Sequence, residues 1–135
     1  MRDLRMLIVE DDYLTQQVLQ PMVSGYGTIE TAIDGYLAAE KIERAYEEGQ
    51  PYDLVFMDIR LSGLNGLEAC GKIRDYERSC GVPDQDACKI LMTTGMSDPH
   101  FVLESFKQGC DGFLLKPYSR EELAAAIAKL GLLAE

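Results

Sequence analysis

Five short apolar runs recur along the chain, and stretches with helical spacing separate them. Each run is short enough for a β-strand and apolar enough to be covered on both faces of a sheet. Strict alternation of strands and helices predicts a parallel sheet with right-handed crossovers and helices on both faces. We therefore expect an α/β fold of five strands and five helices, (βα)5. The expected strands are Met6–Val9, Thr28–Ala32, Leu54–Met57, Ile90–Met92 and Phe113–Leu115.

Apolar residues at helical spacing line one face of each segment between and after these runs. The last helix has the clearest boundary, because Ser119 and Glu122 form a capping-box pattern. Asp98 and Pro99 are typical of the start of the helix before it. Pro21 lies inside the first expected helix and predicts a kink or an early end. The expected apolar faces contain Leu14, Val18 and Met22; Leu37, Ile42 and Ala45; Leu67, Cys70 and Ile73; and Val102, Leu103 and Phe106.

The length, charge and cysteine content of the chain limit its number of domains, its binding partners and its cellular compartment. With 135 residues it matches one typical domain, so we expect residues 1–135 to form a single domain. A net charge of −10 disfavours binding to nucleic acid or to an anionic membrane. We expect neither a signal peptide nor a membrane span. Four cysteines without C-x-x-C spacing and one histidine favour reduced thiols over disulfides or zinc, which predicts a cytoplasmic protein.

Polar residues follow four of the five expected strands. The carboxyl ends of parallel strands meet at one edge of the sheet, and ligands of open α/β sheets bind at that edge. We therefore expect carboxylates, hydroxyls and an ammonium group to converge there from distant parts of the sequence. The residues are Glu10, Asp11 and Asp12 after the first strand, Asp58 after the third, Thr93 and Thr94 after the fourth, and Lys116 after the fifth.

This convergence of carboxylates predicts a metal site. Clustered carboxylates repel one another unless a cation offsets their charge, and hard oxygen ligands suit Mg²⁺. We expect Glu10, Asp11 and Asp58 to bind this ion, so that one carboxylate becomes a nucleophile toward a phosphoryl group. Asp58 is the natural candidate because it ends the central apolar run. Lys116 and a threonine hydroxyl can neutralise and hydrogen-bond a phosphoryl oxygen at that position.

The combination closely resembles the receiver domain of two-component response regulators, the chemotaxis-regulator type of flavodoxin-like fold. The resemblance covers essentially the whole chain. It implies the strand order 2-1-3-4-5. It rests on four segments that occur in order, LIVEDD at 7–12, DIRLSGLNG at 58–66, LMTTG at 91–95 and FLLKPY at 113–118.

The resemblance also implies a function. Asp58 is then the phosphorylation site, which accepts a phosphoryl group from a phosphohistidine on a histidine kinase or histidine phosphotransfer protein. The added charge changes the face formed by the fourth helix, fifth strand and fifth helix, which a downstream protein target reads. The protein is expected to be a regulator that assists its own phosphorylation and dephosphorylation, not an enzyme. The other implied roles are an acidic pair at Glu10 and Asp11, a metal-binding backbone carbonyl at Arg60, a switch hydroxyl at Thr94, a phosphate contact at Lys116 and a rotating aromatic ring at Phe113.

Some positions depart from the family pattern. Ser62 stands where the family usually has proline, and Phe113 lacks the hydroxyl that tyrosine would bring. The segment Tyr76–Lys89 is longer than the usual link, and its glycine, proline and aspartates predict an exposed insertion. For Asp12, we expect a role as the cap of the first helix.

Other functional classes stay open at this point. A phosphohydrolase with an aspartyl-phosphate intermediate commonly has a second acid two residues after the nucleophile. That position is Arg60 here, which disfavours this class of enzyme. A flavodoxin-like cofactor binder is disfavoured because the chain lacks a Gly-rich phosphate loop. A receiver that is never phosphorylated is disfavoured by the complete acidic set. The chain stops just after the fifth expected helix, which fits a stand-alone receiver or one excised from a larger kinase or regulator.

Overall fold

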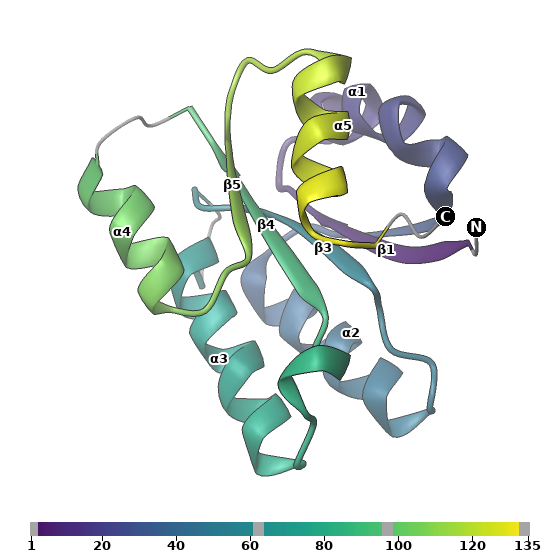
Figure 1. Ribbon diagram of the computed structural model, residues 1–135, viewed down its shortest axis with the longest axis vertical. Coiled ribbons are helices and arrows are strands. Elements are labelled where there is room, and N and C mark those ends of the chain that lie inside the picture. Colours follow the sequence, from purple (N-terminus) through teal and green to yellow (C-terminus); the bar gives the residue numbers. More distant parts are fainter. Residues whose placement is uncertain (1–2, 61–63, 96–98, 133–135) are drawn as a thin grey trace.

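A five-stranded parallel sheet forms the centre of the molecule (Figure 1). The computed structural model describes residues 3–60, 64–95 and 99–132. The strand order is β2-β1-β3-β4-β5, which confirms the expected fold and order. Each strand contains the apolar run expected for it and is one to three residues longer. The strands are β1 (Leu4–Val9), β2 (Gly27–Ala32), β3 (Leu54–Asp58), β4 (Lys89–Thr94) and β5 (Gly112–Leu115).

Helices cover both faces of the sheet (Figure 1). One core lies between the sheet and α2 and α3, and it includes Ile42 of α2 and Ile73 of α3. The other lies between the sheet and α1 and α5, and it includes Leu19 of α1 and Ile127 of α5. In Figure 1, α4 lies beside α3, next to the β5 edge. The helices are α1 (Tyr13–Val23), α2 (Gly35–Glu47), α3 (Gly66–Ser79), α4 (Pro99–Lys107) and α5 (Arg120–Lys129).

The burial of β3 explains why its sequence is an unbroken apolar run ending in one acid. All five of its residues are buried, because it is the middle strand and helices cover both of its faces. The only charged residue of the strand is Asp58, at its carboxyl end. The fold therefore places this carboxylate at the centre of the edge where ligands of such sheets bind.

Two of the expected helix starts are confirmed. The side chain of Ser119 accepts a hydrogen bond from the backbone N–H of Glu122, whose carboxylate accepts one from the N–H of Ser119. The side chain of Asp12 accepts from the N–H of Leu14, so Asp12 is the N-cap of α1. The other expected cap, Asp98, lies outside the described residues, as does Ser62.

Pro21 lies inside the last turn of α1, which continues to Val23 and is followed by a short 3-10 turn over Ser24–Tyr26. The proline removes one backbone donor near the carboxyl end of the helix. The helix ends two residues after it.

The expected apolar faces of α1 and α4 are wrong in part, although both helices form. Met22 packs against the core as expected, but other members of both faces are exposed. Leu14 and Val18 are 72% and 66% exposed, and the residues of α1 that face the core are Gln16, Leu19 and Val23. In α4, Leu103 and Phe106 are exposed and Ser105 is fully buried. Spacing alone identifies a helix, but the sheet selects which side of it is covered.

The segment Tyr76–Lys89 is not an exposed insertion over its whole length. Helix α3 runs on to Ser79, and only residues 80–88 leave regular structure, apart from a 3-10 turn over Asp84–Asp86. Glu77 and Cys88 are buried, at 3% and 1% exposure. The expectation holds for the loop itself, where Gly81, Pro83, Asp84 and Asp86 are exposed. It is wrong at the two ends of the segment, because Glu77 lies in α3 and both Glu77 and Cys88 have buried partners.

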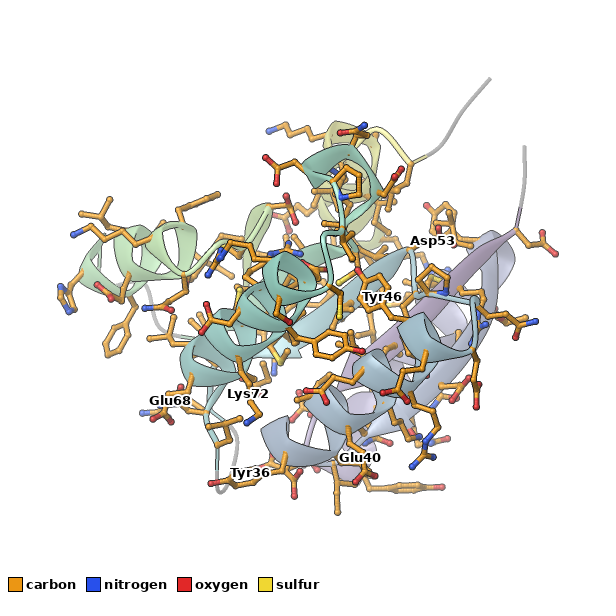
Figure 2. All side chains as sticks on the ribbon, turned by 90° about the horizontal axis from the view of Figure 1, so that it is seen from below. Tyr36, Glu40, Tyr46, Asp53, Glu68 and Lys72 are labelled. Atoms are coloured by element: carbon orange, nitrogen blue, oxygen red, sulfur yellow. The ribbon has the colours of Figure 1, made fainter. Side chains whose placement is uncertain are left out.

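The partners of Glu77 form a network at the edge of the sheet opposite the acidic residues. Glu77 pairs with Arg74 at 2.7 Å and accepts a hydrogen bond from the hydroxyl of Tyr46, which reaches from α2 toward α3 (Figure 2). The guanidinium of Arg74 also donates to the carbonyls of Gly109 and Cys88. These bonds join α2, α3, the start of β4 and the α4–β5 loop, so they stabilise the fold away from the site.

Within the described ranges, no helix combines the length and apolar character needed to cross a bilayer.

Candidate functional site

Three carboxylates converge at the carboxyl edge of the sheet. Val9 of β1 is paired with Met57 of β3, so the residues that follow them, Glu10 and Asp58, are brought side by side. One carboxylate oxygen each from Glu10, Asp11 and Asp58 lies within 4.8 Å of the other two. Glu10 and Asp58 are buried and Asp11 is exposed, so the cluster is open to solvent on one side.

Lys116, which follows the edge strand β5, contacts two of these carboxylates. Its ammonium nitrogen lies 3.0 Å from Oε1 of Glu10 and 3.2 Å from Oδ2 of Asp58. The backbone N–H of Lys116 donates to the carbonyl of Thr94 at 2.7 Å, which continues the pairing of β5 with β4. This hydrogen bond fixes where the lysine leaves the sheet, and the long side chain then reaches β1 and β3.

Burial and charge act against each other in this cluster. Burial raises the pKa of Glu10, and the negative charge of Asp58 adds to the effect, although the hydrogen bond from Lys116 opposes it. Burial lowers the pKa of Lys116, but its hydrogen bond to Glu10 and the charge of Asp58 outweigh burial and raise that pKa overall. Lys116 is therefore a cation at neutral pH.

The backbone around Glu10 is held by hydrogen bonds on both sides. Its N–H donates to the carbonyl of Ala32 in β2 at 3.0 Å, and its carbonyl accepts from Nε2 of Gln16 at 2.6 Å. Oε2 of its carboxylate accepts from the N–H of Asp12 at 3.2 Å. Sequence analysis missed Gln16, because a glutamine on an amphipathic helix carries no signal of its buried partner.

The loop after Asp58 holds this carboxylate from the opposite side. The backbone N–H of Arg60 donates to Oδ1 of Asp58 at 2.9 Å, and the side chain of Arg60 is exposed. The N–H of Ile59 donates to the carbonyl of Thr93 in β4. Gly66 begins α3 so close to this turn that a Cβ atom there would lie 2.3 Å from the carbonyl oxygen of Asp58. A glycine is required at this position.

Thr94 and Phe113 lie in the neighbouring strands β4 and β5 and differ in burial. Thr94 ends β4 and is 1% exposed. Phe113 lies in β5, is half-buried, and packs against the core on the α2 and α3 side of the sheet. Asp12, the third acid of the first loop, accepts from the hydroxyl of Thr15 as well as from Leu14, as expected for a helix cap.

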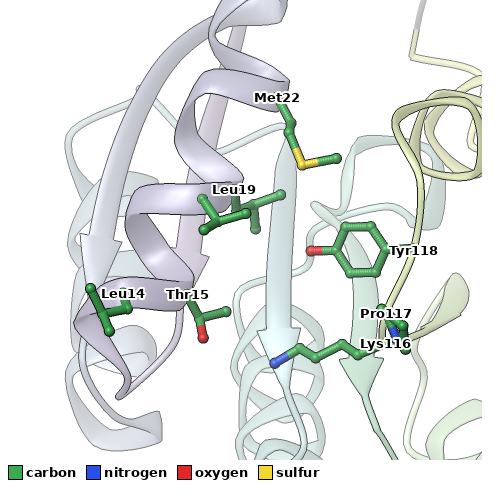
Figure 3. Close-up of a pocket in the computed structure, with 8 residues that line it drawn as sticks. Leu14, Thr15, Leu19, Met22, Lys116, Pro117 and Tyr118 are labelled. Carbon is green, nitrogen blue, oxygen red and sulfur yellow. The ribbon is translucent and has the colours of Figure 1, made fainter.

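An apolar groove adjoins the cluster (Figure 3). It has a volume of about 320 Å³, and it runs between one side of α1 and the Lys116–Tyr118 segment after β5. Leu14 and Met22 line the α1 side, Tyr118 faces them, and the side chain of Lys116 extends across one end. The exposed residues of α1 that the sequence placed in the core therefore form part of this surface.

The donor set fits a small divalent cation. Mg²⁺ is usually held by one or two carboxylates together with water and phosphate oxygens, and this cluster offers three carboxylates on an open edge. Within the described part of the chain, the ammonium group of Lys116 makes ion pairs with two of the three, Glu10 and Asp58. Negative charge therefore remains for a cation to offset.

The sequence matches a known family over most of its length. A model of the response regulator receiver domain family matches residues 6–128. The osmosensing histidine protein kinase SLN1 of Saccharomyces cerevisiae is 30% identical over 127 residues, which are 93% of this chain and 10% of that protein. The chain spans half the length, or less, of the curated relatives it matches. The similarity to each relative therefore concerns only its receiver region and not the rest of that protein.

Solved structures give the same answer. The receiver domain of the sensor histidine kinase PA1611 from Pseudomonas aeruginosa, with a magnesium ion in its active site cleft, is similar with a TM-score of 0.73 and 29% identity, over 92% of this chain and 93% of that one. The receiver domain of the Saccharomyces cerevisiae response regulator Ssk1, in complex with the histidine phosphotransfer protein Ypd1, has a TM-score of 0.77 and 28% identity, over 90% and 84%. These matches support the phosphorelay interpretation and not the phosphohydrolase alternative. The chain belongs to the response regulator receiver domain family, the signalling domain of two-component and phosphorelay systems.

Proposed function

We propose that Asp58 accepts a phosphoryl group from a phosphohistidine of a histidine kinase or a histidine phosphotransfer protein. The observation that carries this proposal is the contact of Lys116 with both Asp58 and Glu10, beside the exposed carboxylate of Asp11. A nucleophile, a cation and an open acidic edge are thereby gathered within one small volume. The complex of the Ssk1 receiver with Ypd1 supports a phosphotransfer protein as donor.

Mg²⁺ is the proposed cofactor, and Glu10, Asp11, Asp58 and the backbone carbonyl of Arg60 would hold it. The magnesium ion in the PA1611 receiver and the three clustered carboxylates of this chain support the assignment. When bound, the ion supplies positive charge that offsets the charge of the phosphoryl oxygens. Asp11 is the exposed carboxylate of the three, so it lies where a hydrated ion can enter.

In the proposed reaction, a carboxylate oxygen of Asp58 attacks phosphorus, the P–N bond of the phosphohistidine breaks, and the electron pair stays on the departing imidazole nitrogen. The N–H of Arg60 and the ammonium of Lys116 hold the two oxygens of Asp58, which fixes the orientation of the carboxylate before attack. Lys116 then contacts a phosphoryl oxygen and offsets the charge that develops there. Hydrolysis of the aspartyl phosphate, assisted by the same residues, returns the domain to its initial state.

The signal would leave the site through Thr94 and Phe113. In this proposal the hydroxyl of Thr94 binds the phosphoryl group, and Phe113 turns inward from its half-buried position. The surface formed by α4, β5 and α5 then changes, and a downstream protein target binds it. Leu103 and Phe106 of α4 and Leu115 of β5 are exposed on these elements, which gives a protein partner apolar surface to contact.

We further propose that residues 1–135 act as one cytoplasmic receiver domain, either alone or as part of a larger signalling protein. The net charge of −10 supports protein partners over nucleic acid or an anionic membrane. The domain would serve as a phosphoacceptor that assists its own phosphorylation and dephosphorylation. Continuous multiple-turnover hydrolysis of phosphomonoesters would instead favour the phosphohydrolase alternative.

The test is intact-protein mass spectrometry after incubation with acetyl phosphate, with Mg²⁺ or with EDTA. We expect one phosphoryl adduct that requires Mg²⁺ and is lost in base. The Asp58→Asn variant should show no adduct. Asp75→Asn is the matched control, since Asp75 is an exposed aspartate of α3 and should leave the adduct unchanged. An adduct of full intensity on the Asp58→Asn variant would refute the proposal.

A further inference from the structure

The side chain of Gln16 is buried although α1 lies at the surface. It is 5% exposed, whereas its neighbour Gln17 is exposed. Among the described residues, every buried side-chain nitrogen and oxygen has a hydrogen-bond partner, so the amide of Gln16 is fully accommodated. A buried amide on a helix face otherwise occupied by Leu19 and Val23 costs desolvation free energy unless its bond serves the structure. The position therefore needs an explanation beyond core packing.

The partner of Gln16 is the backbone of the acidic loop. Nε2 of Gln16 donates to the carbonyl oxygen of Glu10 at 2.6 Å. The N–H of Glu10 is already bonded to Ala32 of β2. The peptide group before Glu10 is thus held by β2, and the peptide group between Glu10 and Asp11 is held by Gln16 of α1.

The direction of Asp11 depends on the peptide group between Glu10 and Asp11. Asp11 is exposed, and its side chain is directed by the backbone between Glu10 and the N-cap Asp12. Without the bond from Gln16, the carbonyl of Glu10 can rotate toward other donors or water, and the carboxylates of Glu10 and Asp11 lose their fixed spacing. Small displacements of this kind weaken metal sites substantially, because hydrogen-bond partners that orient ligands affect affinity about tenfold or more.

We propose that Gln16 is a positioning residue for the acidic pair, which acts through the Glu10 carbonyl to hold Glu10 and Asp11 in the arrangement that binds Mg²⁺. This inference rests on the metal site of the proposed function. The hydrogen bond of Gln16 goes to the carbonyl oxygen of Glu10, so its effect on the two acids passes through the backbone. Its role is to hold the acidic loop where this loop leads from β1 into α1.

The test compares Gln16→Met with Gln17→Met by isothermal titration with Mg²⁺, together with thermal unfolding of each variant. Both changes replace an uncharged amide by an unbranched side chain of similar length and high helix propensity, so charge and helix formation are matched. We expect Gln16→Met to bind Mg²⁺ roughly tenfold more weakly and Gln17→Met to bind as the wild type does. The expected loss persists at temperatures well below the unfolding transition of the variant.

The outcomes separate this inference from the proposed function. Absence of Mg²⁺ binding by the wild-type chain would overturn both. Wild-type affinity in a folded Gln16→Met variant would overturn the role of Gln16 alone. If Gln16→Met does not fold, Gln16→Asn serves instead, since it keeps the amide but shortens its reach by one methylene. The same loss of affinity is expected, and wild-type affinity in that variant would refute the role.

Discussion

The ammonium nitrogen of Lys116 lies 3.2 Å from Oδ2 of Asp58, although 58 residues separate the two in the sequence. The contact exists because β5 and β3 lie in the same parallel sheet with β4 between them, so their carboxyl ends face one edge. The proposed chemistry depends on it, since Asp58 must be both ionised and close to a cation when a phosphoryl group arrives.

Replacing Lys116 should slow phosphorylation without preventing it. A charge-assisted hydrogen bond contributes about 1.5–3 kcal/mol, and about 1.4 kcal/mol corresponds to a tenfold change in rate. We expect Lys116→Met to form the aspartyl phosphate from acetyl phosphate roughly 10- to 100-fold more slowly. Quenched time courses followed by mass spectrometry measure this rate. Lys72→Met is the control, because Lys72 is exposed on α3 (Figure 2), and equal rates in the two variants would contradict the role of Lys116.

The two neighbouring acids Asp11 and Asp12 should differ in their effect on metal binding. Asp11 offers an oxygen to the carboxylate cluster, whereas Asp12 caps α1. Asp11→Asn should weaken Mg²⁺ binding by more than about tenfold, since loss of a ligand's charge costs at least as much as loss of its orienting partner. Asp12→Asn removes the same charge but keeps a good N-cap, so it should bind Mg²⁺ nearly as the wild type does. Isothermal titration calorimetry measures the Mg²⁺ affinity of both variants. A larger loss of affinity in Asp12→Asn than in Asp11→Asn would contradict the assignment of Asp11 as the metal ligand.

The network around Arg74 should contribute to stability far more than a surface ion pair does. Arg74 and Glu77 are largely buried, and removing one partner leaves an uncompensated charge. We expect Arg74→Met to lower the free energy of unfolding by about 3 kcal/mol in urea titrations. Arg78→Met breaks only an exposed pair with Asp75 and should change stability little. Similar unfolding midpoints for the two variants would show that the buried network does not stabilise the fold.

The four cysteines should react at different rates in the native protein. Cys80 is exposed and the other three are buried. Burial raises the pKa of Cys70 to about 12 and that of Cys110 to about 11, and it also raises the pKa of Cys88. A raised pKa leaves less thiolate at a given pH, roughly one part in 1,000 or fewer at pH 8 for Cys70 and Cys110.

Alkylation with iodoacetamide at pH 8, followed by peptide mapping, checks this prediction. Cys80 should be labelled first, and the buried thiols should be labelled at a comparable rate only after unfolding in urea. Equal labelling of Cys70 and Cys80 in the folded protein would contradict the burial of Cys70.

The strands and the acidic edge were predictable because each depends on local sequence. An unbroken apolar run such as that of β3 has few alternatives, and a capping pattern such as Ser119 with Glu122 acts within one turn of helix. Asn65 and Glu68 form a capping box with the same spacing at the start of α3, which the sequence analysis missed.

What the sequence could not show depends on distant partners. Glu77 is separated from Tyr46 by 31 residues. In the sequence, a charged residue at this position indicates an exposed segment. The structure shows it buried because the hydroxyl of Tyr46 and the guanidinium of Arg74 lie beside its carboxylate. Leu14 has helical spacing with Val18, yet both are exposed, because α1 turns Leu19 and Gln16 toward the sheet. Such choices are made by packing against other elements and leave no periodic signal in the helix itself.

In the proposed function, Asp58 carries the phosphoryl group. Treatment of the phosphorylated chain with borohydride reduces an acyl phosphate to an alcohol, so the modified aspartate becomes homoserine and can be located by peptide sequencing in the mass spectrometer. We expect homoserine at position 58 and at no other aspartate, and only after incubation with both acetyl phosphate and Mg²⁺. Homoserine at position 11 or 12 in place of 58, or at position 58 in equal amount without Mg²⁺, would contradict this proposal.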